Sequence, residues 1–325
     1  MKICVVGAGA IGGWIGAGMA RAGHEVSLVA RGGHLDAIRR RGLVLVSDGE
    51  TYTVSASASA DPGDFGVQEA VFIALKAYSI PEMLPLLAPL LGADTVVVPA
   101  INGIPWWYFY KEGGVFDNSV LDCLDPRGTM LEVLDPGHIL GCVVHGAAQV
   151  IEPGVVRHTA GDLIYLGEPD RSVSARARKL SDAMISAGFN APVAGVIRQE
   201  IWMKLIGNLS YNPVAALTLA HMDEISANGR VLALIRIMMR EAMAVAEAYG
   251  IAISLGVEER IEMARQIGHA KISMHQDVEK GRPLEIDAIL GSVLELARRS
   301  RIATPMMDMV HALIEERARH PVTAP

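Results

Sequence analysis

The feature that most constrains this chain lies at its start, where a glycine-rich turn follows a short run of β-branched residues. Lys2–Val6 is typical of a buried strand, and the turn Gly7-Ala8-Gly9-Ala10-Ile11-Gly12 follows it at once. A helix to about Ala22 and a second strand at Glu25–Val29 complete the pattern within about 30 residues. Strand, G-x-G-x-x-G, helix and strand in this order are typical of a parallel α/β sheet whose first turn binds a dinucleotide.

The glycines of this turn have distinct parts in binding a dinucleotide. Gly7 permits the tight turn, Gly9 lets the backbone approach a pyrophosphate, and Gly12 lets the helix pack closely on the strand. The N-terminus of the helix offers unpaired N–H groups to the phosphates. A glycine-rich turn that only packs well is the alternative interpretation.

The residue at the end of the second strand distinguishes the two nicotinamide dinucleotides. NAD sites usually place Asp or Glu there, where a carboxylate binds the ribose 2′-hydroxyl group. This chain has Leu28-Val29-Ala30-Arg31 instead, and an arginine offers a planar cationic fork to a 2′-phosphate. The sequence therefore favours NADP over NAD, and a solvated arginine on a loop is the alternative.

Two polar residues follow later strands of the same sheet. Ala70–Leu75 and Thr95–Val98 are predicted strands; Lys76 follows the first directly, and Asn102-Gly103 comes shortly after the second. Ligands of open α/β sheets gather beyond the carboxyl ends of the strands. Lys76 is therefore a candidate for binding the cofactor, or else faces solvent. Asn102 is a candidate for binding cofactor and substrate, or else forms a plain turn.

An aromatic run follows this turn. Five of the seven residues in Ile104–Tyr110 are aromatic, in a chain that is 5% aromatic. Beside a predicted site, such a run favours a pocket wall or lid, with an oligomer contact as the alternative.

The strand patterns stop near Pro192, and helical patterns continue to the end of the chain. Before that point, Ile139–Leu166 alternates short strand patterns with turn residues, which predicts antiparallel strands that extend the sheet. The change marks a domain boundary near Gly195. We expect an α/β fold: an NADP-binding Rossmann-type doubly wound sheet with an antiparallel extension over residues 1–194, and an all-helical substrate and catalytic domain over residues 195–325.

Three polar residues recur every fourth position in the first of these helices: Lys204, Asn208 and Asn212. Each such step drifts only about 40° around a helix, so the three share a stripe, and this stripe borders the apolar face. The stripe is either a set of satisfied core polar groups or the floor of a polar pocket. Because Pro213 disfavours helical geometry at Asn212, we expect Asn212 to leave the stripe. Lys204 and Asn208 are then the better-supported candidates for a shared polar site.

A second polar stretch, Ser273–Asp287, is punctuated by Gly281 and Pro283. Pro283 suits the first turn of a helix, so Glu285 is expected in that turn, where a carboxylate is also a favourable cap. Ser273 is equally explained as a helix N-cap. The residue types alone leave capping and substrate binding open for both side chains.

Bulk properties exclude several other classes of protein. The net charge of −7 argues against a nucleic-acid binder, and no unbroken apolar run reaches the ~18 residues of a membrane helix. Three cysteines and ten histidines show no metal-ligand spacing, so no metal is expected, and the cysteines favour thiols in a reducing, cytoplasmic compartment. The long apolar helices of the second half permit a homodimer without requiring one.

Taken together, these motifs resemble those of the ketopantoate reductase (2-dehydropantoate 2-reductase) family. They occur in the family's order over nearly the whole chain, as Gly7-x-Gly9-x-x-Gly12, Arg31, Lys76, Asn102-Gly103, Trp202-x-Lys204, Asn208, Asn212-Pro213, Ser273-Met274-x-Gln276-Asp277, Gly281-Arg282 and Glu285-Ile286-Asp287. The glycine motif is generic, whereas the two C-terminal motifs are far more specific.

The resemblance implies NADPH as hydride donor, a small 2-oxo acid as substrate and a site in the cleft between the two domains. The implied reaction reduces 2-dehydropantoate to pantoate in pantothenate biosynthesis. Lys204 would be the general acid, because an ammonium stabilises the charge left on the carbonyl oxygen and then donates the proton. The resemblance also implies that Glu285 is catalytic and contacts the substrate, and that Lys76 lies near cofactor and substrate. The further substrate contacts that it implies are Asn102, Asn208, Ser273 and, less clearly, Asn212.

Two departures from the family pattern bear on the substrate. Ile101 stands where the family usually has glutamine before Asn-Gly, and the aromatic run Trp106–Tyr110 is not a general family feature. A reductase of the same family for a bulkier 2-oxo acid is therefore an alternative. A second alternative is a non-catalytic NADP-binding regulatory protein, against which the presence of both Lys204 and Glu285 argues.

Overall fold

The computed structural model describes residues 1–320, which divide into two compact units. The first, which we call the sheet unit, comprises Met1–Ile101, Trp107–Ser119 and Arg127–Ile197. The second, which we call the helical unit, begins at Asn102–Trp106 and Val120–Pro126 and continues from Arg198 onward. The α/β fold class with an all-helical C-terminal region, as expected from the sequence, is confirmed.

Five parallel strands form the main sheet of the sheet unit, in the order β5-β2-β1-β6-β7. Their bounds are β1 (Lys2–Val6), β2 (Glu25–Val29), β5 (Ser57–Ser59), β6 (Ala70–Ile73) and β7 (Val96–Pro99). The chain adds strands on one side of β1 up to β5 and on the other side from β6 onward. The order therefore reverses at β1, and ligands of such sheets bind at this switch point, beyond the carboxyl end of the strand.

A second, mixed sheet has the order β4-β3-β10-β9. It consists of β3 (Leu43–Ser47), β4 (Glu50–Val54), β9 (Ala147–Glu152) and β10 (Val155–Ala160). Most of the predicted antiparallel strands thus join the β3–β4 hairpin, while β8 (Gly141–Val144) and β11 (Ile164–Gly167) pair separately. The hairpin turns at Asp48 and Gly49, both with positive φ, as a two-residue turn between antiparallel strands requires.

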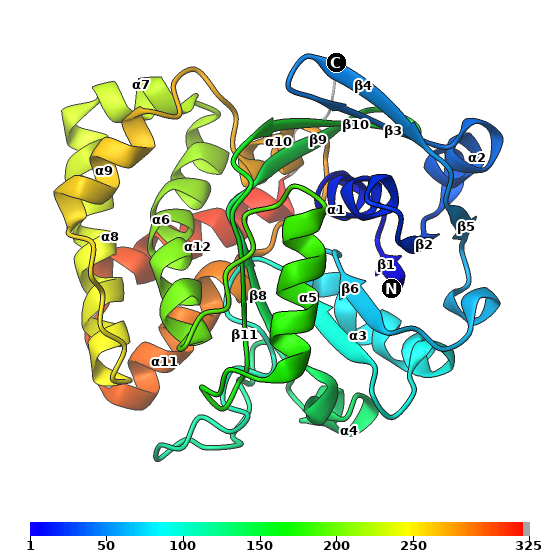
Figure 1. Ribbon diagram of the computed structural model, residues 1–325. Coiled ribbons are helices and arrows are strands. Elements are labelled where there is room, and N and C mark those ends of the chain that lie inside the picture. Colours follow the sequence, from blue (N-terminus) through cyan, green and yellow to red (C-terminus); the bar gives the residue numbers. More distant parts are fainter. Residues whose placement is uncertain (321–325) are drawn as a thin grey trace. The chain divides into compact units, whose positions relative to one another are not determined.

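Helix α1 (Ala10–Arg21) lies between the two sheets and packs on strands of both (Figure 1). Close packing depends on its glycines, because an added Cβ at Gly16 would lie 2.9 Å from Leu28 Cδ2 and one at Gly18 2.5 Å from a Phe189 ring carbon. The other helices of this unit are α2 (Gly32–Arg41), α3 (Ile80–Met83), α4 (Thr129–Val133) and α5 (Ala175–Ser186). The helix that follows the glycine turn is thereby held rigidly at the switch point.

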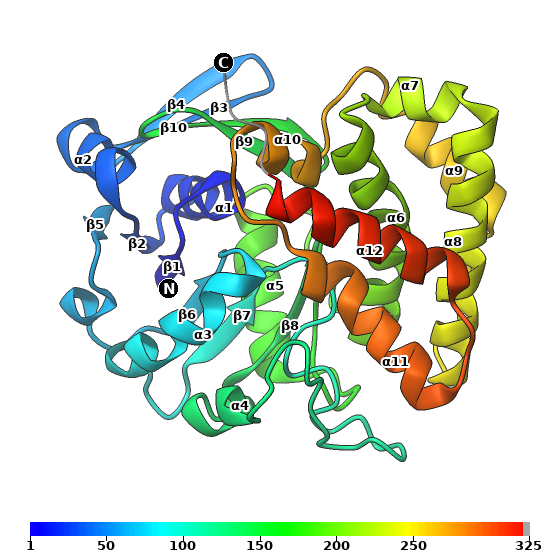
Figure 2. The same cartoon turned by 180° about the vertical axis from the view of Figure 1, so that it is seen from behind.

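The helical unit is built around α8 (Gly229–Ala248), which packs on α7 (Met222–Ala227), α9 (Val257–Arg265), α11 (Ser292–Ser300) and α12 (Pro305–Arg319) (Figure 2). It also holds α6 (Ile197–Thr218), which begins at the last residue of the sheet unit, and α10 (Ser273–Glu279). Among residues 1–320, the helices lack the combined length and apolar character that would be needed to cross a bilayer.

The expectation that Asn212 leaves the helical stripe was wrong. Helix α6 runs without interruption to Thr218 with Pro213 inside it. A proline in this position removes one backbone hydrogen bond, the one to the Leu209 carbonyl, at a cost of about 3 kcal/mol. The residues around it, Leu209–Ala216, are all buried. Their packing therefore outweighs the local preference, and Asn212 stays on the helix.

The expected position of Glu285 in a first helical turn was also wrong. The chain from Arg282 to Glu285 has no regular structure, and a π-helical segment, Asp287–Gly291, begins only after it and leads into α11. Glu285 stands directly before the helical residues, and its carbonyl oxygen accepts from the Ile289 N–H at 3.2 Å, so its carboxylate stands where a side chain can cap the helix. Ser273 is the first residue of α10 and not its N-cap, which is Ile272.

Candidate functional site

The glycine turn after β1 is shaped by two glycines that no other residue could replace without movement. Gly7 has φ +96°, and an added Cβ would lie 2.7 Å from the Ala74 carbonyl oxygen. A Cβ on Gly12 would lie 2.1 Å from the Gly7 carbonyl oxygen. Both therefore bring backbone segments together, as the motif predicts for a tight turn and a closely packed helix.

Gly9 differs from these two, because the protein itself gives no steric reason for a glycine there. An added Cβ would have nothing within 4 Å, and Gly9 is exposed at the N-cap of α1. No side chain caps this end of α1, so its first N–H groups remain available to an anion. The space a Cβ would fill, beside an uncapped helix N-terminus, fits the approach of a pyrophosphate to Gly7-Ala8-Gly9-Ala10-Ile11-Gly12.

His34 holds this turn and was missed by the sequence reasoning. Its Nε2 lies 2.7 Å from the Ala8 carbonyl oxygen, and the Gly154 N–H donates to its Nδ1 at 3.0 Å. Since Nδ1 accepts, Nε2 carries the hydrogen and donates to Ala8, so both ring nitrogens are used by a neutral imidazole. No local pattern indicates this role, because Gly154 lies in the turn between β9 and β10.

Arg31 and Lys76 occupy the ends of β2 and β6, as their sequence positions predict. Arg31 is exposed at the N-cap of α2, and among residues 1–320 its side chain makes no hydrogen bond or ion pair. Lys76 is half-buried and precedes a short 3-10 turn at Ala77–Ser79. Arg31 is thus available to a 2′-phosphate, and the parts of both residues in cofactor binding stay predictions.

In the helical unit, Lys204 and Asn102 meet directly. Lys204 Nζ donates to Asn102 Oδ1 at 2.8 Å, and both side chains are half-buried. They are separated by 102 positions in the chain, so the contact depends on the fold. The amide oxygen orients the Lys204 amino group, which suits it to stabilise a developing oxyanion and to donate a proton.

The position of Asn102 is fixed by the glycine that follows it. Gly103 has φ +83°, and an added Cβ would lie 2.1 Å from the Ala288 carbonyl oxygen. The next residue, Ile104, donates its N–H to the same oxygen at 2.9 Å. The Asn-Gly turn is therefore bound to the π-helical segment Asp287–Gly291, which begins two residues after Glu285, and this contact distinguishes it from a plain surface turn.

The remaining candidates lie on three segments of the helical unit. Asn208 is half-buried on α6, one turn after Lys204, and Asn212 is buried at 4% exposure one turn further on. Glu285 is also buried, at 5% exposure, whereas Ser273 is exposed. The continuous helix keeps the three α6 residues on one stripe; contacts of this stripe with substrate stay predictions.

Arg260 is a second residue that the sequence reasoning missed. From α9 it donates to the backbone carbonyls of Met203 and, at 3.2 Å, of Lys204. Its guanidinium also lies 3.1 Å from the position a Cβ on Gly207 would take. Desolvation by the surrounding protein lowers the pKa of Arg260. The side chain of Arg260, from α9, thus fixes the backbone of the α6 turn that carries Lys204.

The aromatic run does not form an exposed surface. Trp106, Trp107, Tyr108 and Phe109 are exposed by 4% or less, so the alternative of an oligomer contact is wrong for these side chains. In the sheet unit, Trp107 packs so closely on Gly141 that an added Cβ there would lie 2.7 Å from its ring. Core packing thus accounts for this part of the run.

A separate cavity of about 440 Å³ opens in the helical unit. It contains none of the predicted site residues and is lined by Asp122, Cys123, Asp287, Gly291, Leu294, Glu295, Arg298 and His311. Within residues 1–320, no group of three or more His, Cys, Asp or Glu side chains is arranged to hold a metal ion.

The reversal of strand order at β1, with its uncapped glycine turn, defines a Rossmann-type dinucleotide-binding fold joined to a helical unit that carries a lysine–asparagine pair. A family model described as ketopantoate reductase PanE/ApbA matches residues 3–171, and the model of its C-terminal part matches residues 196–318. The chain belongs to this ketopantoate reductase PanE/ApbA family.

This chain is similar to individual proteins of known name or structure over nearly its full length. A 2-dehydropantoate 2-reductase of Mesorhizobium japonicum is 45% identical over 98% of this chain and 98% of its own. A crystal structure from Ralstonia solanacearum MolK2, provisionally identified as a ketopantoate reductase, is 37% identical with a TM-score of 0.93 and covers 99% of both chains. A ternary structure of D-mandelate dehydrogenase with NADH and anilino(oxo)acetate has a TM-score of 0.86 over 99% of this chain and 100% of its own; at 22% identity it shows a shared fold alone.

Proposed function

We propose that this protein is an NADPH-dependent 2-dehydropantoate 2-reductase, which reduces the C2 carbonyl of 2-dehydropantoate to give pantoate in pantothenate biosynthesis. The observation that carries the proposal is the hydrogen bond from Lys204 Nζ to Asn102 Oδ1 at 2.8 Å, in a chain of this family. It supports a positioned proton donor in the unit to which the resemblance assigns catalysis.

The chain's own residues would bind the substrate and move one proton. When bound, the reduced nicotinamide supplies a hydride to the carbonyl carbon, so negative charge collects on the carbonyl oxygen. Lys204 stabilises that charge with its ammonium and donates the proton from Nζ, which completes the hydroxyl group. Asn102 orients the ammonium, and the buried Glu285 supplies an acceptor for a substrate hydroxyl. Further substrate contacts are proposed for Asn208, Asn212 and Ser273.

NADPH is proposed over NADH because of Arg31. The residue stands at the end of β2, where an acidic residue would select NADH, and its guanidinium is exposed. The pyrophosphate would lie on the N–H groups of α1 beside Gly9, where an added Cβ would meet nothing. Lys76 is proposed to contact the cofactor from the end of β6.

Steady-state oxidation of NADPH and NADH by the purified chain tests the proposal against a panel of 2-oxo acids. The panel holds 2-dehydropantoate, a smaller aliphatic 2-oxo acid and an aryl 2-oxo acid. We expect the highest kcat/KM with 2-dehydropantoate and a preference for NADPH. A higher kcat/KM with the aryl compound would indicate a bulkier 2-oxo acid as the substrate in place of 2-dehydropantoate. Binding of NADPH without turnover of any compound would indicate a regulatory protein.

The side chains of Trp106–Phe109 are buried, which is compatible with core packing and with a pocket wall, so the aryl 2-oxo acid of the panel tests the alternative of a bulkier substrate. Two further expectations stay predictions: a homodimer, which light scattering of the purified chain tests, and a cytoplasmic location. Among the described residues the three cysteines form no disulfide, and Cys4 and Cys142 are buried.

A further inference from the structure

His34 joins three segments of the sheet unit at the glycine turn. It lies in the first turn of α2, three residues after Arg31. Its Nε2 donates to the Ala8 carbonyl oxygen at 2.7 Å, and its Nδ1 accepts from the Gly154 N–H at 3.0 Å. One half-buried ring therefore connects the proposed pyrophosphate site, helix α2 and the turn between β9 and β10.

The bond to Ala8 fixes the direction of a whole peptide group. Peptide groups are planar, and among residues 1–320 all of them are trans. In a trans peptide, the carbonyl of one residue and the N–H of the next point in opposite directions. By holding the Ala8 carbonyl on one side, His34 therefore directs the Gly9 N–H to the other side.

The Gly9 N–H is a donor that an anion can use. Among residues 1–320 it has no hydrogen-bond partner, and it lies at the N-cap of α1, where no side chain caps the helix. The Ala8 N–H, by contrast, donates to the Val29 carbonyl oxygen at 2.9 Å. With His34 on the carbonyl, both backbone groups of Ala8 are used within the protein, so Gly9 provides the first N–H left for a phosphate.

The peptide between Ala8 and Gly9 needs such a restraint. Its reversal changes ψ of Ala8 and φ of Gly9, and glycine adopts positive φ about as readily as negative φ. Sterics do not restrain Gly9 either, since an added Cβ would meet nothing within 4 Å in the described chain. The missing side chain that lets a pyrophosphate approach therefore leaves the direction of the N–H to be set by another residue.

His34 is itself held from the second sheet. The Gly154 carbonyl accepts from the Val44 N–H at 2.9 Å, which ties the β9–β10 turn to β3. The same turn packs on α2, because an added Cβ on Gly154 would lie 2.9 Å from Ala37 Cβ. The ring that reaches Ala8 is thus fixed at its other nitrogen by a well-anchored turn.

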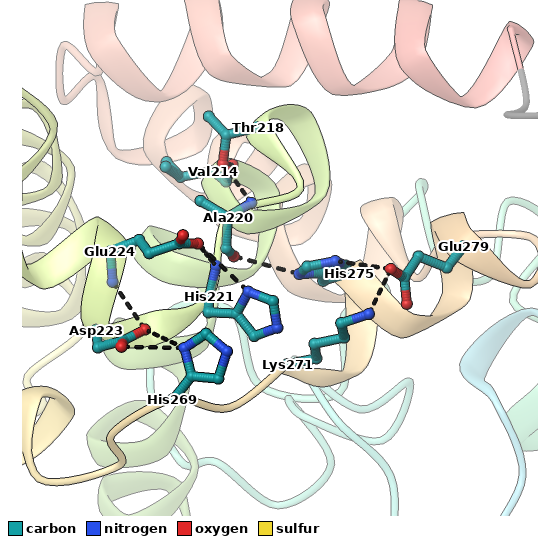
Figure 3. A network of polar contacts seen from close by, with 10 residues as sticks. All are labelled: Val214, Thr218, Ala220, His221, Asp223, Glu224, His269, Lys271, His275 and Glu279. Atoms are coloured by element: carbon teal, nitrogen blue, oxygen red, sulfur yellow. Dashed lines mark hydrogen bonds and ion pairs between the residues drawn. The ribbon is translucent and has the colours of Figure 1, made fainter.

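Other histidines bind a backbone carbonyl away from the glycine turn. In the helical unit, His275 Nδ1 lies 3.2 Å from the Ala220 carbonyl oxygen, and its Nε2 faces the Glu279 carboxylate at 3.4 Å (Figure 3). In the sheet unit, His138 Nδ1 lies 2.8 Å from the Thr95 carbonyl oxygen. Thr95 directly precedes β7, at the opposite end of the parallel sheet from the glycine turn. His138 therefore offers a matched control for the loss of a histidine-to-carbonyl bond.

We propose that His34 is a positioning residue for the nicotinamide dinucleotide: by holding the Ala8 carbonyl, it aims the Gly9 N–H at the cofactor pyrophosphate. The proposal rests on the proposed binding of NADPH at the glycine turn. Because the ring acts through Ala8, the donor at Nε2 carries the effect, and the acceptor at Nδ1 holds the ring. His34 thus contributes to NADPH affinity and not to the rate of hydride or proton transfer.

Two substitutions separate the nitrogens of His34. His34→Gln places an N–H donor as many bonds from Cα as Nε2, so it keeps the bond to Ala8. His34→Asn places an oxygen as many bonds from Cα as Nδ1, so it keeps the acceptor for Gly154 alone. In isothermal titration calorimetry, the Kd for NADPH should rise about 3–10-fold in His34→Asn and His34→Ala and stay within about twofold in His34→Gln. A histidine that only supports the fold through Gly154 predicts the opposite order.

Adenosine 2′-phosphate, which carries the 2′-phosphate but no pyrophosphate, identifies the part of the cofactor that His34 serves. Its Kd should stay within about twofold in all three variants, because no bond to it is lost. At saturating NADPH, kcat should also stay within about twofold, so that the loss is seen in KM for NADPH. His138→Ala should leave both Kd values unchanged.

An NADPH affinity that is the same in the unaltered chain and in all three variants would overturn the proposal. An equal weakening of adenosine 2′-phosphate would overturn it as well, because the effect would then act on Arg31 through α2. Failure of the proposed function gives a different result: a chain that binds NADPH but turns over no 2-oxo acid still allows the Kd values to be compared. If His34→Ala does not fold, the glutamine and asparagine variants carry the test.

Discussion

Replacement of Lys204 by alanine is the most direct test of the proposed chemistry. The change removes the ammonium that lies 2.8 Å from Asn102 Oδ1 and leaves helix α6 otherwise intact. A charged hydrogen bond to a developing oxyanion contributes about 2–3 kcal/mol, and a positioned proton donor adds a further ~1–2 kcal/mol over water. Because Lys204 is half-buried, water reaches the site and replaces part of this effect.

These contributions predict that Lys204→Ala lowers kcat by about 10²–10⁴-fold, since each ~1.4 kcal/mol on the barrier is a factor of ten. NADPH affinity should stay within about threefold, because the glycine turn belongs to the sheet unit. The loss of NADPH absorbance with 2-dehydropantoate measures kcat, and fluorescence titration measures NADPH binding. Lys280→Ala, which removes an exposed lysine at the end of α10, is the control and should keep full turnover.

Near-normal turnover in Lys204→Ala would refute the assignment of Lys204 as general acid. A lysine that only supports the fold would give a different result, with a lower thermal midpoint and weaker NADPH binding alongside the lower kcat. Lys204→Met, which keeps most of the volume, separates the two cases: its fold should be preserved while its kcat falls as far as in the alanine variant. Asn102→Ala should lower kcat less, by about tenfold, because it removes only the orienting hydrogen bond.

Arg31→Ala should raise KM for NADPH about tenfold and leave KM for NADH within about twofold, because only NADPH carries a 2′-phosphate; equal effects on both in steady-state kinetics would contradict the cofactor assignment. Gly9→Ala should weaken NADPH binding without lowering the thermal midpoint, since its Cβ meets nothing in the protein, whereas Gly12→Ala should lower both. An unchanged NADPH affinity in Gly9→Ala would remove the proposed pyrophosphate position. Glu168→Ala should lower the free energy of unfolding by about 3 kcal/mol in urea titrations, because this carboxylate, 4% exposed, accepts two hydrogen bonds from Arg176 at 2.6 and 2.7 Å. A loss below ~1 kcal/mol would show that the pair contributes little.

The sheet unit was predictable because its signals are local. The bounds of β1 and β2 are those expected from their β-branched runs, and the glycine spacing between them indicated the switch point. A buried parallel strand needs apolar residues on both faces, so its pattern depends on few distant partners. The β3–β4 hairpin is local in the same way, because its two-residue turn consists of Asp48 and Gly49, residue types that tolerate the positive φ such a turn requires.

The contacts of the candidate site join residues far apart in the chain, and the sequence pattern alone does not pair them. Resemblance placed Lys204 and Asn102 in one site, but their hydrogen bond depends on Gly103 fitting against Ala288, which no local pattern reports. The role of His34 likewise depends on a turn 120 positions away. Which distant residues come into contact is decided by the packing of the elements. A sequence pattern, by contrast, indicates only which face of an element is apolar.

Helix α6 shows how tertiary contacts override local propensity at the proposed catalytic lysine. It contains Gly207, which costs about 1 kcal/mol relative to alanine in a helix, and Pro213, which costs about 3 kcal/mol. Arg260 accounts for the glycine, because its guanidinium takes the place of a side chain and binds the carbonyls of Met203 and Lys204. A desolvated arginine is itself costly, as its lowered pKa indicates. Gly207 and the desolvated Arg260 are therefore two locally unfavourable choices at the turn that carries Lys204, and their common result is a backbone held beneath the proposed proton donor. Pro213 lies about two turns further along the helix, where the packing of buried neighbours outweighs its cost.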